Sequence, residues 1–397
     1  MTNLGSEHGN FACSDSRINA IWQIGSDALK NSAIDCLEIP ALLYTACDRK
    51  ASRAALLTIF GTNSDELRYD LPLAAEQIES AWRHFLFTGD RTILGEIQPK
   101  IDSILKSVTT KLDDEGLISN TFAGNNQLSN SALFSHALRF ASRIARATGN
   151  PERAGEMEML LTDVSDSINE LLWQQSSEGY RSKPTGEMGQ VDGIGSLIAA
   201  VAEVPDRYQL ESVRKTIGCL APWSTETIPS DILNFTLKAM AKLGFYGEAL
   251  QIMSNAWQPN SAGVALSSFE PNSFLASEIA GIKPIQPGFE EFAIKVQPAG
   301  LSSVEASVHT IRGPIAISWR QSTEDAVSVE LSSPKGIRGH LTIPTDKPVR
   351  TVTINDQVVY DFENTKRKST MEGFDVAHRK LRFRTPGGTY KFEVASL

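Results

Sequence analysis

The sequence predicts a mainly helical protein that ends in an all-β domain. Apolar residues recur every three or four positions over the N-terminal part, as in amphipathic helices, and every second position from Glu291 onward, as in strands. Between these parts, Pro284 and Pro287 prevent a further helix because proline lacks an amide donor and restricts the residue before it. We therefore predict two domains, residues 11–283 and residues 284–397.

The N-terminal part consists of predicted helices joined by short turns. Turns such as Thr88-Gly89-Asp90 and Gly149-Asn150 contain the polar residues and glycine that end one helix and begin the next. After a first helix that begins at Ser14-Asp15, the predicted helices span residues 49–60, 72–88, 90–112, 129–148, 151–175, 192–204, 207–217, 230–243, 246–257 and 273–282.

Helical hairpins repeated in this way favour an α/α toroid, a closed ring of inner and outer helices. Ser131–Ala147 and Ile194–Val204 are rich in small and apolar residues, so we expect them in the inner ring. An open helical solenoid is the alternative, since no repeat of fixed length is visible. In a toroid, the loops at one end of the inner helices would form a bowl, where we expect a ligand to bind.

The C-terminal part reads as about eight short alternating strands, a pattern that predicts an antiparallel β-sandwich. Turn signals separate the predicted strands at Gly313-Pro314, Pro334-Lys335-Gly336, Asn355-Asp356 and Gly387-Gly388. No catalytic arrangement is visible in this part, so we expect it to support the barrel.

Composition excludes several classes of function. The net charge of −9 over 397 residues argues against a nucleic-acid partner, and no apolar run approaches the roughly 20 residues that span a bilayer. The N-terminus lacks the order of a secretory signal, and the four cysteines have no metal-ligand spacing, so we expect a cytoplasmic protein with reduced thiols. Neither a glycine-rich phosphate loop nor a nucleophile elbow is present, and we expect no metal or cofactor.

Two passages resemble a known family. Residues 281–298 read GIKPIQPGFEEFAIKVQP, and residues 11–22 read FACSDSRINAIW. They resemble the C-terminal passage and the start of the catalytic barrel in bacterial α-L-rhamnosidases and related six-hairpin glycosidases. Further short matches keep the family's order, namely Trp82 with Phe85, Thr88-Gly89-Asp90, Gly116-Leu117-Ile118, Leu172-Trp173, Gly179-Tyr180 and Gln190-x-Asp192. The resemblance covers residues 11–320 and implies an (α/α)6 barrel, or six-hairpin toroid, followed by a small antiparallel β-sandwich.

The resemblance also implies where a general acid should lie. Active family members carry a D-C-P-x-R-E-like motif after the first helix, and it supplies the acid and the groups that hold the sugar. Here the D-C-P core reads E-I-P, with Ile39 at the aspartate position, and the Arg-Glu pair is replaced by apolar residues. Asp48 is then the candidate acid, with Glu38 as a second. Asp35 and Arg49 are candidate sugar ligands.

The family's general base is a glutamate after a run of small residues, and Glu270 follows such a run at residues 264–269. Inverting hydrolysis needs two carboxyl groups roughly 6.5–9.5 Å apart, one to protonate the leaving group and one to activate water. Trp82 and Trp223 fit either sugar stacking or helix packing. Asp192 fits either a helix N-cap or a sugar contact.

Three functions remain open from the sequence. The first is an inverting glycosidase of the α-L-rhamnosidase type that acts on a terminal sugar, which Glu270 favours. The second is a non-catalytic relative that binds a sugar or a partner, which Ile39 and the missing Arg-Glu pair favour. The third is a related barrel with other chemistry on a sugar or a small natural product. We expect a carbohydrate or glycoside ligand, and the sequence indicates no oligomeric state.

Overall fold

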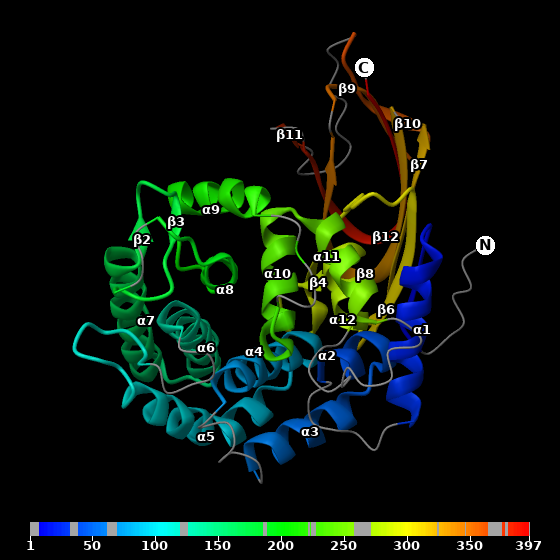
Figure 1. Cartoon of the computed structure of the whole chain (residues 1–397). Coiled ribbons are helices and arrows are strands. Elements are labelled where there is room, and N and C mark those ends of the chain that lie inside the picture. The colour runs from blue at the N-terminus through cyan, green and yellow to red at the C-terminus, as the bar shows by residue number, and fades with distance from the viewer. Residues whose placement is uncertain are drawn as a thin grey trace.

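A ring of helices stands beside a large β-sheet in the computed structural model (Figure 1). The fold is therefore mainly helical with a C-terminal all-β part, as the sequence predicts. No helix in the described parts of the chain is long and apolar enough to cross a membrane. The structure describes residues 8–31, 39–61, 70–119, 126–185, 189–220, 223, 228–257, 271–323, 325–345, 347–363, 375–377 and 380–396.

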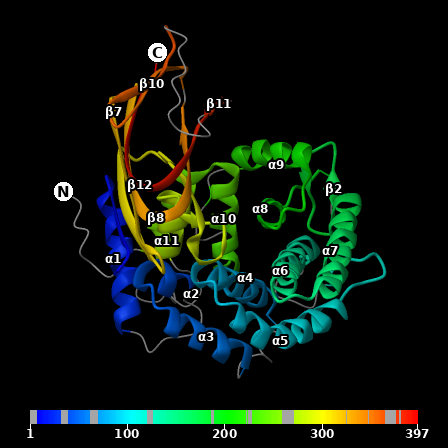
Figure 2. The same cartoon turned by 180° about the vertical axis from the view of Figure 1, so that it is seen from behind.

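The described helices form an inner and an outer ring. In both views α4, α6, α8 and α10 lie inside α3, α5, α7 and α9 (Figures 1 and 2). The outer helices are α1 (Ser16–Asn31), α3 (Arg49–Gly61), α5 (Arg91–Thr109), α7 (Pro151–Leu171), α9 (Arg207–Cys219) and α11 (Tyr246–Ala256). The inner helices are α2 (Ile39–Ala41) with the π-helical turn η1 (Leu42–Ala46), α4 (Leu71–Thr88), α6 (Gln127–Ala147), α8 (Gly193–Val201), the 3₁₀ turn η3 (Ser230–Ile232) with α10 (Leu233–Leu243), and α12 (Pro271–Phe274) with the π-helical turn η4 (Leu275–Ile279).

The ring is closed rather than open, because its last helices contact its first ones. Helix α12 contacts α2 and η1, and α11 contacts α1. The predicted toroid is thus confirmed against the solenoid. Residues 39–46 form an inner helix that the sequence pattern does not predict, and all but Ala46 are buried.

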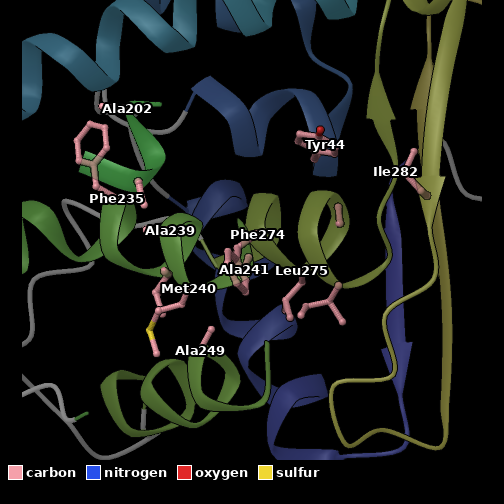
Figure 3. Close-up of a cluster of buried hydrophobic side chains, with 14 of the residues drawn as sticks. Tyr44, Ala202, Phe235, Ala239, Met240, Ala241, Ala249, Phe274, Leu275 and Ile282 are labelled. Carbon is pink, nitrogen blue, oxygen red and sulfur yellow. The ribbon is translucent and has the colours of Figure 1, made fainter. Parts of the chain in front are cut away.

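Inner and outer helices differ in how many of their faces are buried. Helix α6 buries residues on every face, including serines, whereas α7 buries one stripe of Ala154, Met157, Val164 and Ile168. The same dense packing joins α10, α11 and α12, where Met240, Ala249 and Phe274 lie in one buried cluster (Figure 3).

Aspartate or asparagine side chains cap the N-termini of three inner helices. Asp70 accepts the amide of Leu73 at 2.9 Å, Asn126 that of Ser129 at 3.0 Å, and Asp192 that of Gly195 at 2.8 Å. Each satisfies an amide that would otherwise lack a partner in the first turn.

The sheet has the order β1-β6-β7-β8-β12-β9-β10. Its pairings are antiparallel except that β5 pairs with β8 in parallel. Strand β1 comes from the N-terminal end and pairs Phe11 with Ala306, so residues predicted to belong to the barrel also contribute to the sheet. The strands are β1 (Asn10–Cys13), β4 (Lys283–Pro284), β5 (Glu291–Lys295), β6 (Ser303–Thr310), β7 (Gly313–Thr323), β8 (Ala326–Pro344), β9 (Val349–Ile354), β10 (Gln357–Asp361), β11 (Asp375–Ala377) and β12 (Lys380–Ser396), and β2 (Trp173–Gln174) with β3 (Gly179–Tyr180) forms a separate hairpin.

The turns predicted at Pro334-Lys335-Gly336 and Gly387-Gly388 are instead one bend in the long two-stranded ribbon of β8 and β12. Strands β8 and β12 pair along most of their length, and their register jumps from Pro386 opposite Arg338 to Gly388 opposite Ser333. A Cβ at Gly387 would lie 1.8 Å from the Pro334 carbonyl oxygen, so only glycine permits this close approach. The two predicted turns therefore form a bulge at which the sheet bends, without reversing the chain.

The connector packs the sheet against the C-terminal end of α4. Phe289, in the 3₁₀ turn η5 (Pro287–Phe289), meets the Phe87 ring edge-on with centroids 4.8 Å apart. Phe87 in turn meets Tyr44 of η1 at 4.5 Å, and Arg312 donates to the Gly288 carbonyl at 2.7 Å. These contacts hold barrel and sheet in a fixed relation.

We expect the stability of the barrel to fall in mild acid because of His84. Burial lowers the pKa of His84 to about 4, and its Nδ1 lies 2.6 Å from the Ser52 hydroxyl. The unfolded chain takes up this proton below about pH 6.5 and the native state does not, so unfolding is favoured as the pH falls from about 6.5 toward 4. From pH 7 to pH 5 the free energy of unfolding falls in wild type, and we expect this fall to be about 2 kcal/mol smaller in His84→Gln. Urea unfolding at both pH values measures it, and identical pH dependence in the two proteins would refute this assignment.

Candidate functional site

The N-terminal ends of the inner helices lie at one end of the barrel. Inner and outer helices alternate along the chain, so the inner helices all run in the same direction. We call this end, with the first two turns of each inner helix, the bowl. Its described starting residues are Ile39, Leu71, Gln127, Gly193, Ser230 and Pro271.

A buried carboxylate below the bowl joins three inner helices. Glu79 of α4 accepts from Arg83 Nε at 2.8 Å and from Lys238 Nζ of α10 at 3.0 Å. Its other contact is His136 Nε2 of α6 at 3.1 Å. The Glu79 side chain is only 6% exposed, so this network is shielded from solvent.

The network fixes the charge of its members. Burial alone would raise the pKa of Glu79, but the charges of Arg83 and Lys238 hold it well below its usual range. Burial lowers the pKa of His136 despite the neighbouring carboxylate. We therefore infer a neutral imidazole that donates from Nε2 to an ionised Glu79.

A second carboxyl group, Glu76, lies one turn before Glu79 on the same helix and within the bowl. It is half-buried and accepts a hydrogen bond from Nδ2 of Asn234 on α10. Burial raises the pKa of Glu76, and Lys238 and Asn234 offset only part of that shift. Two carboxyl groups on one face of α4 thus have pKa values shifted in opposite directions, an arrangement that suits acid–base chemistry.

Several buried polar side chains of the inner helices have an atom without a hydrogen-bond partner among the described residues, and three of them lie in the first two turns of α4, α6 and α8. These three are the Gln77 amide, Nδ2 of Asn130 and the Ser196 hydroxyl, each at most 3% exposed. Buried polar groups are seldom left unpaired. Gln77, Asn130 and Ser196 are therefore candidates to bind the hydroxyl groups of a ligand.

The structure brings Asp192 and Trp223 together at the rim of the bowl. Both line a cavity of about 440 Å³ between the start of α6 and the start of α8. Asp192 caps α8 and accepts from Asn126 Nδ2 at 2.6 Å, so both its carboxylate oxygens are engaged. Arg181 lines the same cavity.

Asp48 and Arg49 do not reach the bowl. The inner helix α2–η1 carries the chain from the bowl to the opposite end of the barrel, where Tyr44 meets Phe87 in the last turn of α4. Asp48 follows this helix, is exposed, and accepts the Ala51 amide at 2.9 Å as the N-cap of α3. Arg49 is exposed beside it.

Trp82 lies in the second half of α4, away from the bowl, with its ring 5.4 Å from that of Phe85. The candidates Glu270, Glu38 and Asp35 lie outside the described residues. Within the described parts of the chain, no group of three His, Cys, Asp or Glu side chains could hold a metal ion.

The comparisons with family models and with solved structures agree on the fold. Residues 281–356 match the family model of the bacterial alpha-L-rhamnosidase C-terminal domain. No curated protein matches the sequence.

Solved structures extend the likeness to both parts of the chain. The alpha-L-rhamnosidase from Dictyoglumus thermophilum matches with a TM-score of 0.77 at 16% identity, over 98% of this chain and 50% of that one. The Streptomyces avermitilis alpha-L-rhamnosidase, solved with L-rhamnose, gives a TM-score of 0.70 at 14% identity, over 97% of this chain and 42% of that one. A GH78 family rhamnosidase from Bacillus sp. GL1 gives a TM-score of 0.68 at 19% identity, over 85% of this chain and 43% of that one. The chain has the α-L-rhamnosidase fold and spans about half the length of these structures.

Proposed function

We propose that this chain, which has the fold of α-L-rhamnosidases, is an inverting glycosidase that removes a terminal α-L-rhamnosyl unit from a glycoside. The observation that carries the proposal is the shared fold across both barrel and sheet. The polar bowl supports it, since half-buried Glu76 and the unpaired polar groups below it suit a hydroxylated ligand. A ligand of this kind offers both donors and acceptors.

We propose Glu76 as the general acid. A general acid must hold a proton near neutral pH, and burial raises the pKa of Glu76. Glu76 would protonate the glycosidic oxygen as its bond to the anomeric carbon breaks. Water would attack that carbon from the opposite face and give its proton to Glu270, the residue that the resemblance assigns as the base.

Hydrolysis of a panel of aryl glycosides tests this proposal. We expect release of the aryl group from the α-L-rhamnoside, and little or none from the α-L-arabinofuranoside or the β-D-glucoside. Equal rates on all three would contradict rhamnoside specificity.

A non-catalytic sugar-binding relative is the second candidate, and Ile39 favours it. This residue stands where active family members have an aspartate and is 0% exposed. A binding protein would hydrolyse no member of the panel, yet L-rhamnose would raise its melting temperature by mass action.

Substituting Glu76 and Asp48 separates their roles. We expect Glu76→Gln to slow hydrolysis of a methyl or alkyl glycoside by about 10²–10⁴-fold. An aryl glycoside with a good leaving group should be much less affected, because it needs little protonation. Asp48→Asn should stay close to wild type on both substrates, since asparagine caps helices as well as aspartate does. If Asp48→Asn, and not Glu76→Gln, slowed the alkyl glycoside and spared the aryl glycoside, Asp48 would be the general acid.

A further inference from the structure

The bend of the sheet forms a second cavity, separate from the bowl. Its volume is about 810 Å³, within the range of small-molecule sites. Residues of β5, β8, β12 and the β9–β10 turn line it. Strands β8 and β12 run side by side there, in the upper part of Figure 1 and from behind in Figure 2.

Strand register places several charged side chains on the cavity face. Glu291 pairs with Arg338, and His340 pairs with Arg384. Directly paired residues point to the same face, as do residues two apart on one strand. These four side chains therefore share one face, and the intervening Gly339 and Phe383 are buried.

The charge of this face is positive, although the chain as a whole carries −9. Glu291 is the single acidic residue among the lining residues; it forms an ion pair with Arg338 and lies 3.7 Å from His340 Nε2. Arg384 is exposed and forms no ion pair with any residue that the structure describes. An unpaired guanidinium beside a cavity favours a carboxylate or another oxyanion.

The rest of the lining suits a sugar better than a bare anion. Tyr390 is half-buried and contributes its ring, and Pro386 adds apolar surface. Asn355 lies in the turn between β9 and β10, Gln357 is the first residue of β10, and both side chains are exposed. Oδ1 of Asn355 accepts the Lys391 amide at 2.8 Å, which fixes that side chain with its NH₂ group free to donate. An aromatic ring beside side-chain amides, one of them held in place, offers what a sugar's CH groups and hydroxyls require.

We propose that this cavity is a binding site for an acidic saccharide, with a uronic-acid carboxylate on Arg384 and the sugar ring against Tyr390. Asn355 and Gln357 bind its hydroxyl groups. The site binds without chemical change to the ligand and does not depend on hydrolysis in the bowl, so it operates equally in a Glu270→Gln variant.

Calorimetric titration of the full chain with digalacturonic acid tests the proposal. We expect saturable binding that weakens with added NaCl, and about tenfold or greater loss in Arg384→Ala, the size expected for a hydrogen bond between charged groups. Tyr390→Ala should also weaken binding. Arg320→Ala, which removes an exposed arginine of the same sheet outside the cavity, should bind as wild type does.

Two further titrations identify the ligand class. The dimethyl ester of digalacturonic acid keeps the sugar and removes the charge, so it should bind at least tenfold more weakly. Inorganic phosphate should bind weakly and should not compete at equal concentration. No binding of digalacturonic acid, unchanged binding in Arg384→Ala, or phosphate binding as tight as the saccharide would each overturn the proposal.

Discussion

Replacing Glu79 by alanine is expected to destabilise the barrel by about 3–5 kcal/mol, the usual effect of removing one partner from a buried ion pair. The carboxylate joins α4, α6 and α10, and its loss leaves Arg83 and Lys238, 19% and 12% exposed, without their counter-charge. Chemical unfolding followed by circular dichroism measures the change.

The stabilisation by Glu79 should also depend on pH. Because the pKa of Glu79 is lowered in the fold, its contribution to the free energy of unfolding is present above about pH 4.3 and disappears as the pH falls below that value.

Glu158→Ala is the matched control. Glu158 also forms an ion pair, with Arg146 at 2.6 Å, but both side chains are exposed to solvent, at 45% and 59%. We expect a change below about 1 kcal/mol, as for other surface pairs. Equal effects of the two substitutions would show that the Glu79 network does not stabilise the barrel.

Glu270→Gln is expected to reduce hydrolysis by about 10²–10⁴-fold while the fold is retained. Glutamine keeps the size of the side chain and cannot accept the proton of the attacking water. The steady-state rate on the aryl α-L-rhamnoside measures the loss, and an unchanged circular dichroism spectrum confirms the fold. Glu290→Gln removes an exposed carboxylate in the connector and should leave the rate within about twofold of wild type. Full activity in Glu270→Gln would refute the assigned base.

The sequence predicts the fold well where local periodicity determines it. Helical spacing locates the long helices, and small-residue content correctly places α6 and α8 in the inner ring. Residues 39–46 are a different case, because a short buried helix with a π-helical turn has no amphipathic period to detect. Glycine and proline at 334–336 and 387–388 signal a local break in a strand, and the pattern alone does not distinguish a turn from a bulge.

The candidate site is harder to predict because its partners are distant in sequence. Glu79 and Lys238 are 159 positions apart, and only the closed ring brings them together. The sequence does carry one signal, since Glu76, Glu79 and Arg83 form a charged stripe at helical spacing within an otherwise uncharged helix. The sequence suggests Asp48 for the site because its pattern does not reveal the inner helix before that residue. That helix carries the chain to the other end of the barrel.

The most direct test of the proposed function is the anomeric configuration of the sugar first released from an α-L-rhamnoside, observed by ¹H NMR during the first minutes of the reaction. We expect wild type to release β-L-rhamnose, which then mutarotates to the α-anomer, and Glu270→Gln to release almost none. Initial release of the α-anomer would contradict the inverting mechanism, and absence of any release by wild type would contradict the assignment as a glycosidase.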